Sequence, residues 1–124
     1  MEAATKYIKT RKQFGKPLAD FQYLQFKLAQ MGTELEASRL MVRNAATMID
    51  QKHPDKTMYC AMAKHFATEK CSDVVNYALQ MHGGYGYLRE YPIERYFRDL
   101  RVHQILEGTS EIMQLITSRA LLKD

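Results

Sequence analysis

Two long stretches, in which apolar or small residues recur every three or four positions, constrain this fold more than any other feature of the sequence. The first runs from about residue 21 to residue 50, and its stripe comprises Leu24, Leu28, Met31, Leu35, Ser38, Val42, Ala45 and Ile49. That spacing places all of these residues on one face of an α-helix. The sequence therefore predicts one long helix over this segment, with this face turned toward the rest of the protein.

The second stretch runs from about Thr57 to Met81, and most residues of its stripe are small: Cys60, Ala63, Ala67, Cys71, Val74, Ala78 and Met81. Small side chains allow a neighbouring helix to approach closely, so we expect the two long helices to pack against each other. The segment "QKHPDK" lies between them and contains a proline, which ends helices. It predicts the turn that joins the two.

Three shorter helices complete the prediction. Residues 2–10 look helical without a capping residue before them, and the glycine and proline of "RKQFGKP" stop that helix. A helix over about residues 92–102 would begin with a proline, which suits a first helical turn. Thr109 can cap a last helix that extends to about Leu122. Without any alternating strand pattern, the expected fold is all-α, an up-and-down four-helix bundle with a short first helix added.

Composition limits the classes of function. The chain has 124 residues with 46% hydrophobic and 26% charged residues, as in an ordinary globular domain. Its net charge of +4 is scattered among acidic residues, so no nucleic-acid-binding stripe is predicted. No apolar run approaches the roughly 20 residues that span a bilayer.

The cysteines and histidines predict neither a disulfide nor a metal site. The cysteines at positions 60 and 71 would lie about 16 Å apart along one helix, too far for a disulfide. The four histidines show no metal-ligand spacing, and we predict no metal site.

One short motif, "HQILEGTSEI", places Glu107 after two apolar residues and directly before a glycine. A carboxylate with apolar neighbours is poorly solvated, which suits a general base. Gly108 would let a ligand approach the backbone closely. The first turn of the following helix would offer unpaired backbone N–H groups to polar ligand atoms. The same pattern also fits a surface glutamate before a turn, and these residues alone leave both interpretations open.

Two other segments are similarly ambiguous. The glycines of "QMHGGYGY", residues 80–87, could fold the backbone around a ligand or could simply end a helix. The segment has neither the strand context of a dinucleotide-binding fingerprint nor the lysine of a P-loop. Arg11 in "RKQFG" could pair with a phosphate or lie on the surface.

Taken together and in order, the segments "RKQFGKPLADFQ", "QMHGGYGY" and "YFRDLRVHQILEGTSEI" resemble the C-terminal helical domain of the acyl-CoA dehydrogenases over essentially the whole chain. The resemblance implies a flavoprotein with FAD as cofactor that oxidises short or branched acyl-CoA to 2,3-enoyl-CoA. It further implies an electron-transfer flavoprotein as partner and a homo-oligomer, either a dimer or a tetramer. The implied location is the mitochondrial matrix in a eukaryote or the cytoplasm in a bacterium.

The resemblance also implies roles for individual residues. Glu107 matches the catalytic base, next to Gly108 in the substrate site. The positions that match flavin contacts are Arg11, Gln13, Phe14, Gln22, Gln80, Met81, His82, Gly83, Gly84, Thr109, Ser110 and Glu111. Residues 80–84 would wrap the cofactor of a neighbouring subunit. Glu111 is a glutamine in some members. Some members place the base elsewhere in the sequence, and "ILEGTSEI" favours the type with the base at Glu107.

One departure from the family is large. Members carry an N-terminal helical domain and a β-domain before this region, and residues 1–124 match only the C-terminal helical bundle. We therefore expect this chain by itself to hold part of an active site, to be inactive alone and to expose apolar surface that promotes self-association. A non-catalytic helical interaction module derived from the family is the alternative. A generic bundle with chance motifs is disfavoured by the full-length match.

Overall fold

The structure is a computed structural model that describes residues 1–123, and it confirms the all-α prediction. The α-helices are α1 (Glu2–Thr10), α2 (Gln22–Asp50), α3 (Lys56–His82), α4 (Ile93–Val102) and α5 (Ser110–Leu121). Two short 3-10 helices follow α1 and α3, namely η1 (Leu18–Asp20) and η2 (Gly83–Tyr87). The strands β1 (Lys12–Gln13) and β2 (Lys16–Pro17) form a small hairpin.

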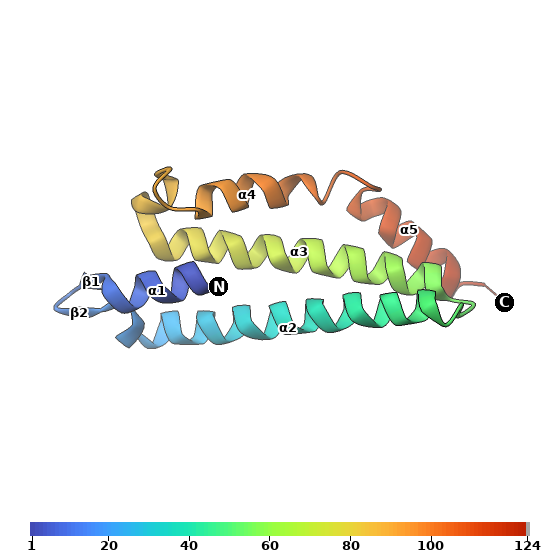
Figure 1. Ribbon diagram of the computed structural model, residues 1–124, viewed down its shortest axis with the longest axis horizontal. Coiled ribbons are helices and arrows are strands. Elements are labelled where there is room, and N and C mark those ends of the chain that lie inside the picture. The colour runs from blue at the N-terminus through green and yellow to red at the C-terminus, as the bar shows by residue number, and fades with distance from the viewer. Residues whose placement is uncertain (124) are drawn as a thin grey trace.

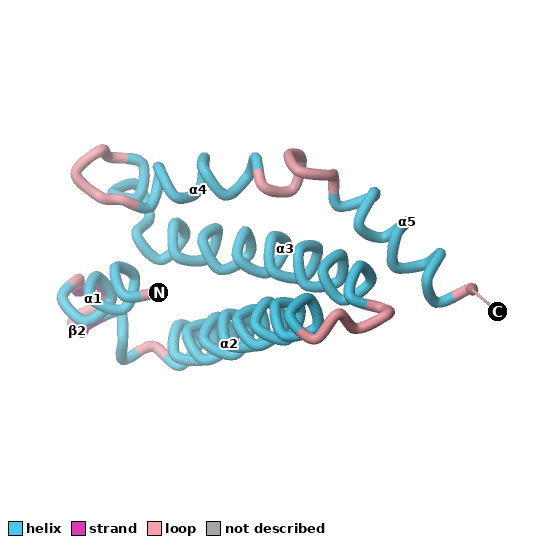
Figure 2. Tube along the Cα trace, turned by 45° about the vertical axis from the view of Figure 1, so that its right-hand side comes forward, coloured by secondary structure: helices cyan, strands magenta, loops and turns pink. Residues whose placement is uncertain are grey.

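The helices form an elongated bundle with α3 in the middle (Figure 1). The long helices α2 and α3 run antiparallel along one another, and the small residues of the α3 stripe allow a close approach. The short α1 packs on the C-terminal part of α3. On the far side of α3, α4 and α5 follow each other in the same general direction, joined by a loop, so that together they accompany its length (Figure 2).

The main core lies where α1, α2, α3 and α4 meet. It consists of the buried side chains Ala4, Ile8, Met31, Val74, Ala78, Met81 and Ile93. The alanines let the helix axes come close, and the larger side chains fill the space between them. This core fixes α1 and the C-terminal end of α3 relative to each other, which positions the first site described below.

The predicted buried face of α2 is only partly buried. Met31, Ser38 and Ala45 are buried, whereas Val42 and Ile49 are 50% and 52% exposed. The reason is tertiary: α1 packs near the start of α2, while α5 packs on α3 rather than on α2. The second half of α2 therefore keeps an open apolar face.

The hairpin between α1 and η1 was not predicted from the sequence. Phe14 and Gly15 at its tip have φ angles of 53° and 80°, which is the signature of a tight two-residue turn. A phenylalanine in this region of φ is uncommon, and its side chain is 92% exposed. Sequence periodicity cannot reveal such a turn, because each strand has only two residues.

The predicted helix ends agree well with the structure. Thr109 caps α5, with its Oγ1 accepting a hydrogen bond from the Ile112 N–H at 3.3 Å. Gly83 ends α3 with φ 57° and ψ −141°, a combination that is nearly confined to glycine. Gly83 leads directly into η2. Among residues 1–123, no helix carries an apolar stretch long enough to cross a bilayer.

Candidate functional site

The structure brings the "RKQFG" and "QMHGG" segments together at one end of the bundle. Their side chains line a pocket of about 530 Å³, and the predicted site residues among its lining are Arg11, Gln13, Gln80, Met81, His82, Gly83 and Gly84. Leu18, Tyr7, Tyr85 and Leu88 complete the wall. The pocket forms because α1 lies against the end of α3, so that Arg11, the residue directly after α1, comes beside the α3–η2 junction.

Charge and open backbone are the chemical features of this pocket. The Arg11 guanidinium lies over the ring of Tyr85, with its Cζ 5.2 Å from the ring centroid. Gly83 and Gly84 are exposed, and an added Cβ at either would meet nothing within 4 Å. A guanidinium beside uncovered backbone suits a phosphate-bearing ligand.

An aromatic cluster supports the pocket from behind. His82 is 3% exposed, stacks on Tyr7 at 4.3 Å between ring centroids, and shares a hydrogen bond of 2.7 Å between its Nδ1 and the Ala78 carbonyl. Burial, only partly offset by the charge of Arg11, raises the pKa of Tyr7, so this phenol stays neutral at physiological pH. Met81 is also buried. Met81 and His82 are thus buried parts of the pocket wall.

Two predicted contacts lie outside the lining of this pocket. Phe14 projects from the hairpin tip, and its ring meets Phe21 edge-on at 6.2 Å between centroids. Gln22 is exposed at the first residue of α2. Both side chains are exposed in this chain.

The remaining predicted residues form a second cluster in the loop between α4 and α5. Glu107 and Gly108 have φ angles of 56° and 96°, so two successive residues adopt a left-handed backbone. The Glu107 side chain is exposed, and so are its neighbours Ile105, at 54%, and Leu106. The expectation that these neighbours keep the carboxylate dry is therefore wrong within this chain, because the loop lies at the surface with only α3 beneath it.

This loop is tied to the middle of α3 by two charged side chains. The Lys64 Nζ donates to the Gly108 carbonyl at 2.6 Å. The Glu69 carboxylate accepts from Gln104 Nε2 at 2.7 Å and from Ser110 Oγ at 2.6 Å. Ser110 N–H also donates to the Gln104 carbonyl at 3.0 Å, which closes the loop on itself. Sequence reasoning missed Lys64 and Glu69, because the contacts join positions 35 to 44 residues apart.

Other residues of the loop are engaged in local structure. A Cβ added to Gly108 would lie 2.5 Å from the Met113 Cε, the flexible end of a side chain that can move aside, so it is mainly the φ of 96° that favours glycine there. Thr109 caps α5, and Ser110 contacts Glu69. A hydrogen bond from its own backbone N–H, followed by one from Thr109, lowers the pKa of Glu111, so this exposed side chain stays ionised at the helix start.

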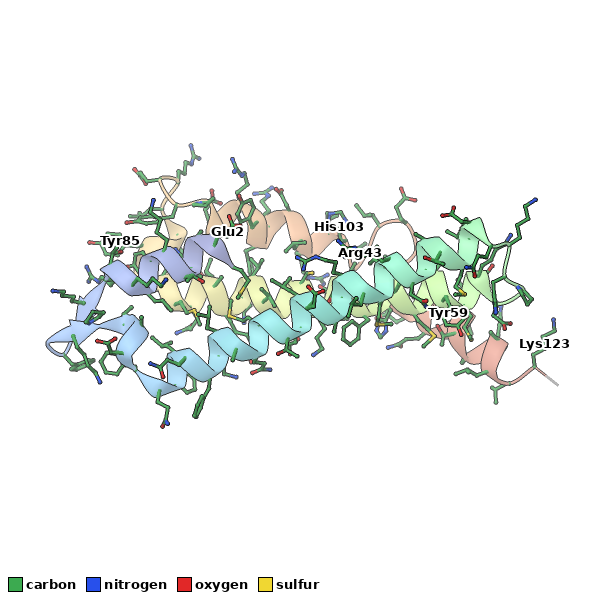
Figure 3. All side chains as sticks on the ribbon, turned by 60° about the horizontal axis from the view of Figure 1, so that its bottom comes forward. Glu2, Arg43, Tyr59, Tyr85, His103 and Lys123 are labelled. Atoms are coloured by element: carbon green, nitrogen blue, oxygen red, sulfur yellow. The ribbon has the colours of Figure 1, made fainter. Side chains whose placement is uncertain are left out.

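The two clusters are separate within this chain. In Figure 3, Tyr85, which belongs to the first pocket, lies toward one end of the molecule, and His103, at the start of the second cluster, lies nearer the middle. Both clusters nevertheless contact α3, which contributes Gln80–His82 to the first pocket and Lys64 and Glu69 to the contacts with the second cluster. In residues 1–123 we find no grouping of three or more His, Cys, Asp or Glu side chains that could hold a metal ion.

Comparison with known proteins gives a consistent result. The family described as "Acyl-CoA dehydrogenase, C-terminal domain" matches residues 1–122. Mitochondrial isobutyryl-CoA dehydrogenase of Bos taurus is 56% identical, over 98% of this chain and 29% of the relative. The caffeyl-CoA reductase–Etf complex subunit CarC of Acetobacterium woodii is 50% identical, over 99% of this chain and 32% of the relative. The structure of butyryl-CoA dehydrogenase from Megasphaera elsdenii superposes with a TM-score of 0.94 at 43% identity, covering 98% of this chain and 32% of the other.

Two points follow from these matches. The chain spans about a third of the length of the relatives that it matches. The sequence also predicts the isobutyryl-CoA dehydrogenases as the most similar members, from the segments "QYLQFKLAQM", "RLMVRNAA", "ALQMHGGYGYL" and "RVHQILEG". The bovine relative supports that prediction. With its helical bundle and a match over residues 1–122, this chain belongs to the acyl-CoA dehydrogenase family, as a C-terminal domain.

Proposed function

We propose that this chain is the C-terminal part of a FAD-dependent dehydrogenase that oxidises short or branched acyl-CoA, isobutyryl-CoA foremost, to 2,3-enoyl-CoA. The observation that carries the proposal is the position of Glu107, which is held on an exposed, left-handed turn with its carboxylate available to a ligand. In this role the carboxylate removes a proton from the carbon next to the thioester carbonyl. Gly108, which has no side chain, leaves room for the thioester.

The first pocket, with its guanidinium and uncovered backbone, supports FAD as the cofactor of this proposed reaction. Arg11 would pair with its diphosphate, Gln13 and Phe14 would contact the adenosine portion, and Gln80–Gly84 would lie along it with uncovered backbone. Bound FAD supplies an acceptor for the hydride that leaves the β-carbon. Gln22, Thr109, Ser110 and Glu111 are proposed as further contacts.

The separation of the two clusters has a simple explanation under this proposal. If residues 80–84 contact the cofactor of a neighbouring subunit, one chain need not bring its own two clusters together. The proposed state is therefore a homo-oligomer, a dimer or a tetramer. An apolar surround for Glu107 would come from other parts of the enzyme, since this chain leaves its carboxylate exposed.

Electron transfer and location rest on the relatives. The Acetobacterium relative is named as a subunit of an Etf complex, which supports an electron-transfer flavoprotein as partner. The bovine relative is named as mitochondrial, which supports the mitochondrial matrix if this chain is eukaryotic. A bacterial chain would act in the cytoplasm.

A non-catalytic interaction module is the second candidate. The exposed apolar side chains favour it, among them Phe26, Leu40, Val42 and Ile49 along α2. Such a module would keep the bundle and use its open faces to bind partners, with Glu107 idle.

One substitution separates the two candidates. We would place this chain in the position of the matching C-terminal segment of bovine isobutyryl-CoA dehydrogenase and introduce Glu107→Gln into that chimera. We expect unchanged flavin content and loss of at least about 1,000-fold in kcat, since the base takes part in the chemical step. Glu90→Gln, in the exposed loop after η2, is the matched control and should leave kcat unchanged. Substantial turnover in the Glu107 variant would show that another group is the base.

A further inference from the structure

We propose that Lys64 and Glu69 of α3 are positioning residues for the reaction, because together they set the backbone conformation that presents the Glu107 carboxylate. This inference rests on the proposed function, in which Glu107 is the base. Lys64 bonds the Gly108 backbone carbonyl, and Glu69 bonds the side chains of Gln104 and Ser110. Both act through the loop that carries the base.

The contacts bracket Glu107 on both sides. Three residues before it, Gln104 donates its side-chain N–H to one oxygen of Glu69, and three residues after it, Ser110 donates its hydroxyl to the other oxygen. One carboxylate therefore joins the two ends of the loop. The two hydrogen bonds are 2.7 Å and 2.6 Å long, which is typical of hydrogen bonds to an ionised acceptor.

The third contact acts on the turn itself. The Lys64 ammonium donates at 2.6 Å to the Gly108 carbonyl, which belongs to the peptide between Gly108 and Thr109. Because the carbonyl direction depends on ψ of Gly108, this contact fixes the rotation of that peptide. The Gln104 side chain, the Ser110 hydroxyl and the Gly108 carbonyl are thus all bonded to residues 64–69 of α3, a long helix that provides a rigid support.

The backbone conformation shows why such anchoring is needed. Glu107 has φ 56°, a region that non-glycine residues rarely occupy, and Gly108 follows with φ 96°. Residues held in this region persist only where surrounding contacts determine them. Without the bracket, Glu107 would relax to negative φ, and its carboxylate would point in another direction.

Burial supports a specific role rather than a general surface contact. Lys64, Glu69, Gln104 and Ser110 are all partly buried, whereas Glu107 itself is exposed. The supporting contacts are shielded from water, and the residue that they present is open to a ligand. This is the arrangement of a held catalytic group on a rigid scaffold.

The test begins with the 124-residue chain and needs no activity. Amide hydrogen exchange is measured for the Ser110 N–H, which donates to the Gln104 carbonyl, with the buried Met31 amide in α2 as internal reference. We expect Glu69→Ala and Lys64→Met each to speed exchange at Ser110 at least about tenfold and to leave Met31 unchanged. Lys56→Met, at the exposed first residue of α3, should change neither. Unchanged exchange at Ser110 would overturn the proposal.

The second arm uses the chimera with bovine isobutyryl-CoA dehydrogenase. We expect Glu69→Ala and Lys64→Met to lower kcat about 10- to 100-fold, with KM for the acyl-CoA within about threefold and normal flavin content. Glu69→Gln should recover most of the rate, since its amide can hydrogen-bond both Gln104 and Ser110. A loss of flavin, or a loss that Glu69→Gln does not recover, would mean a general structural role and would overturn the proposal.

The two arms also separate this inference from the proposed function. If the Glu107→Gln variant keeps its turnover, Glu107 is not the base. Lys64 and Glu69 then have no positioning role in catalysis, even if exchange at Ser110 responds as expected. If Glu107→Gln abolishes turnover while exchange at Ser110 is unaffected by the α3 variants, the base assignment stands and the positioning role fails.

Discussion

Gly108 is the residue at which side-chain size and backbone conformation both matter. Its φ of 96° disfavours any other residue, and an added Cβ would meet the Met113 side chain. We expect Gly108→Ala to lower the free energy of unfolding by about 1–3 kcal/mol, most of it from the backbone, since the flexible end of Met113 can move aside. Urea unfolding of the 124-residue chain measures this. Gly84→Ala is the control, with open space around its Cα and an expected change within about 0.5 kcal/mol. Equal effects of the two variants would contradict this account.

Cys71 provides a pH-dependent contribution to stability. Burial between α2 and α3 raises the pKa of its thiol, and the Ser38 hydroxyl opposes that shift only in part. The neutral form is therefore favoured in the folded chain. Its contribution is fully present below the pKa of an unfolded thiol, about 8.5, and is lost as the pH rises through the folded value.

This predicts a difference that unfolding experiments can measure. Under reducing conditions, we expect the free energy of unfolding to fall between about pH 8 and pH 10 and expect Cys71→Ala to remove part of that slope. Cys60→Ala, at another partly buried free thiol on α3, is the comparison variant. The pKa of Tyr7 is raised in the same direction from about 10, so measurements at or below pH 10 exclude most of its effect. An unchanged slope in Cys71→Ala would refute the assignment.

At the scale of the element, α5 depends on Thr109, the residue that caps its start. The Thr109 hydroxyl accepts the Ile112 N–H and so satisfies one of the donors that a helix start leaves unpaired. We expect Thr109→Ala to cost about 0.5–2 kcal/mol in the free energy of unfolding and Thr109→Ser to cost much less. Circular dichroism during urea unfolding measures both. If alanine and serine prove equal, the cap does not stabilise α5.

The elements were largely predictable because their signals are local. The periodic stripes of α2 and α3, the proline before α4 and the threonine before α5 each act within a few residues, and the observed bounds lie within one or two positions of those expected. The hairpin at Phe14–Gly15 was not predictable, because it has no repeating pattern. The exposure of Val42 and Ile49 was missed for a different reason, since it depends on where α1 and α5 pack.

The site was predictable only in part. Resemblance to a family indicated which residues to examine, and the structure brings Arg11 and Gln80–Gly84 into one pocket, although the roles of these residues stay predictions. The contacts of Lys64 and Glu69 could not be predicted from the sequence. A helix has the same sequence pattern whether a charged side chain points to solvent or contacts a loop that is distant in the chain. The exposure of Glu107 likewise depends on what covers the loop in three dimensions.

At the scale of the whole molecule, the open face of α2 predicts self-association. Val42 and Ile49 lie two helical turns apart on that face and are both half exposed. We expect the double substitution Val42→Lys/Ile49→Lys to shift the 124-residue chain toward monomer in sedimentation velocity while preserving its helix content. Asn44→Lys/Thr47→Lys adds the same charge at exposed polar positions of α2 and is the matched control. Equal dissociation by both pairs would indicate a general charge effect rather than loss of an apolar contact.

The placement of both clusters on α3 limits how this chain can vary in length. Eleven residues separate Glu69, which holds the base loop, from Gln80 in the first pocket, so the two clusters are offset by about 16 Å along the helix. A one-residue insertion between them would turn one cluster by about 100° relative to the other and move it by about 1.5 Å. The turn at residues 51–55 precedes the α3 residues of both clusters and could gain or lose residues without altering the offset between Glu69 and Gln80. The number of residues between Glu69 and Gln80 in α3 thus fixes the distance and the rotation between the two clusters. An inserted tag or peptide would be tolerated in the turn before α3.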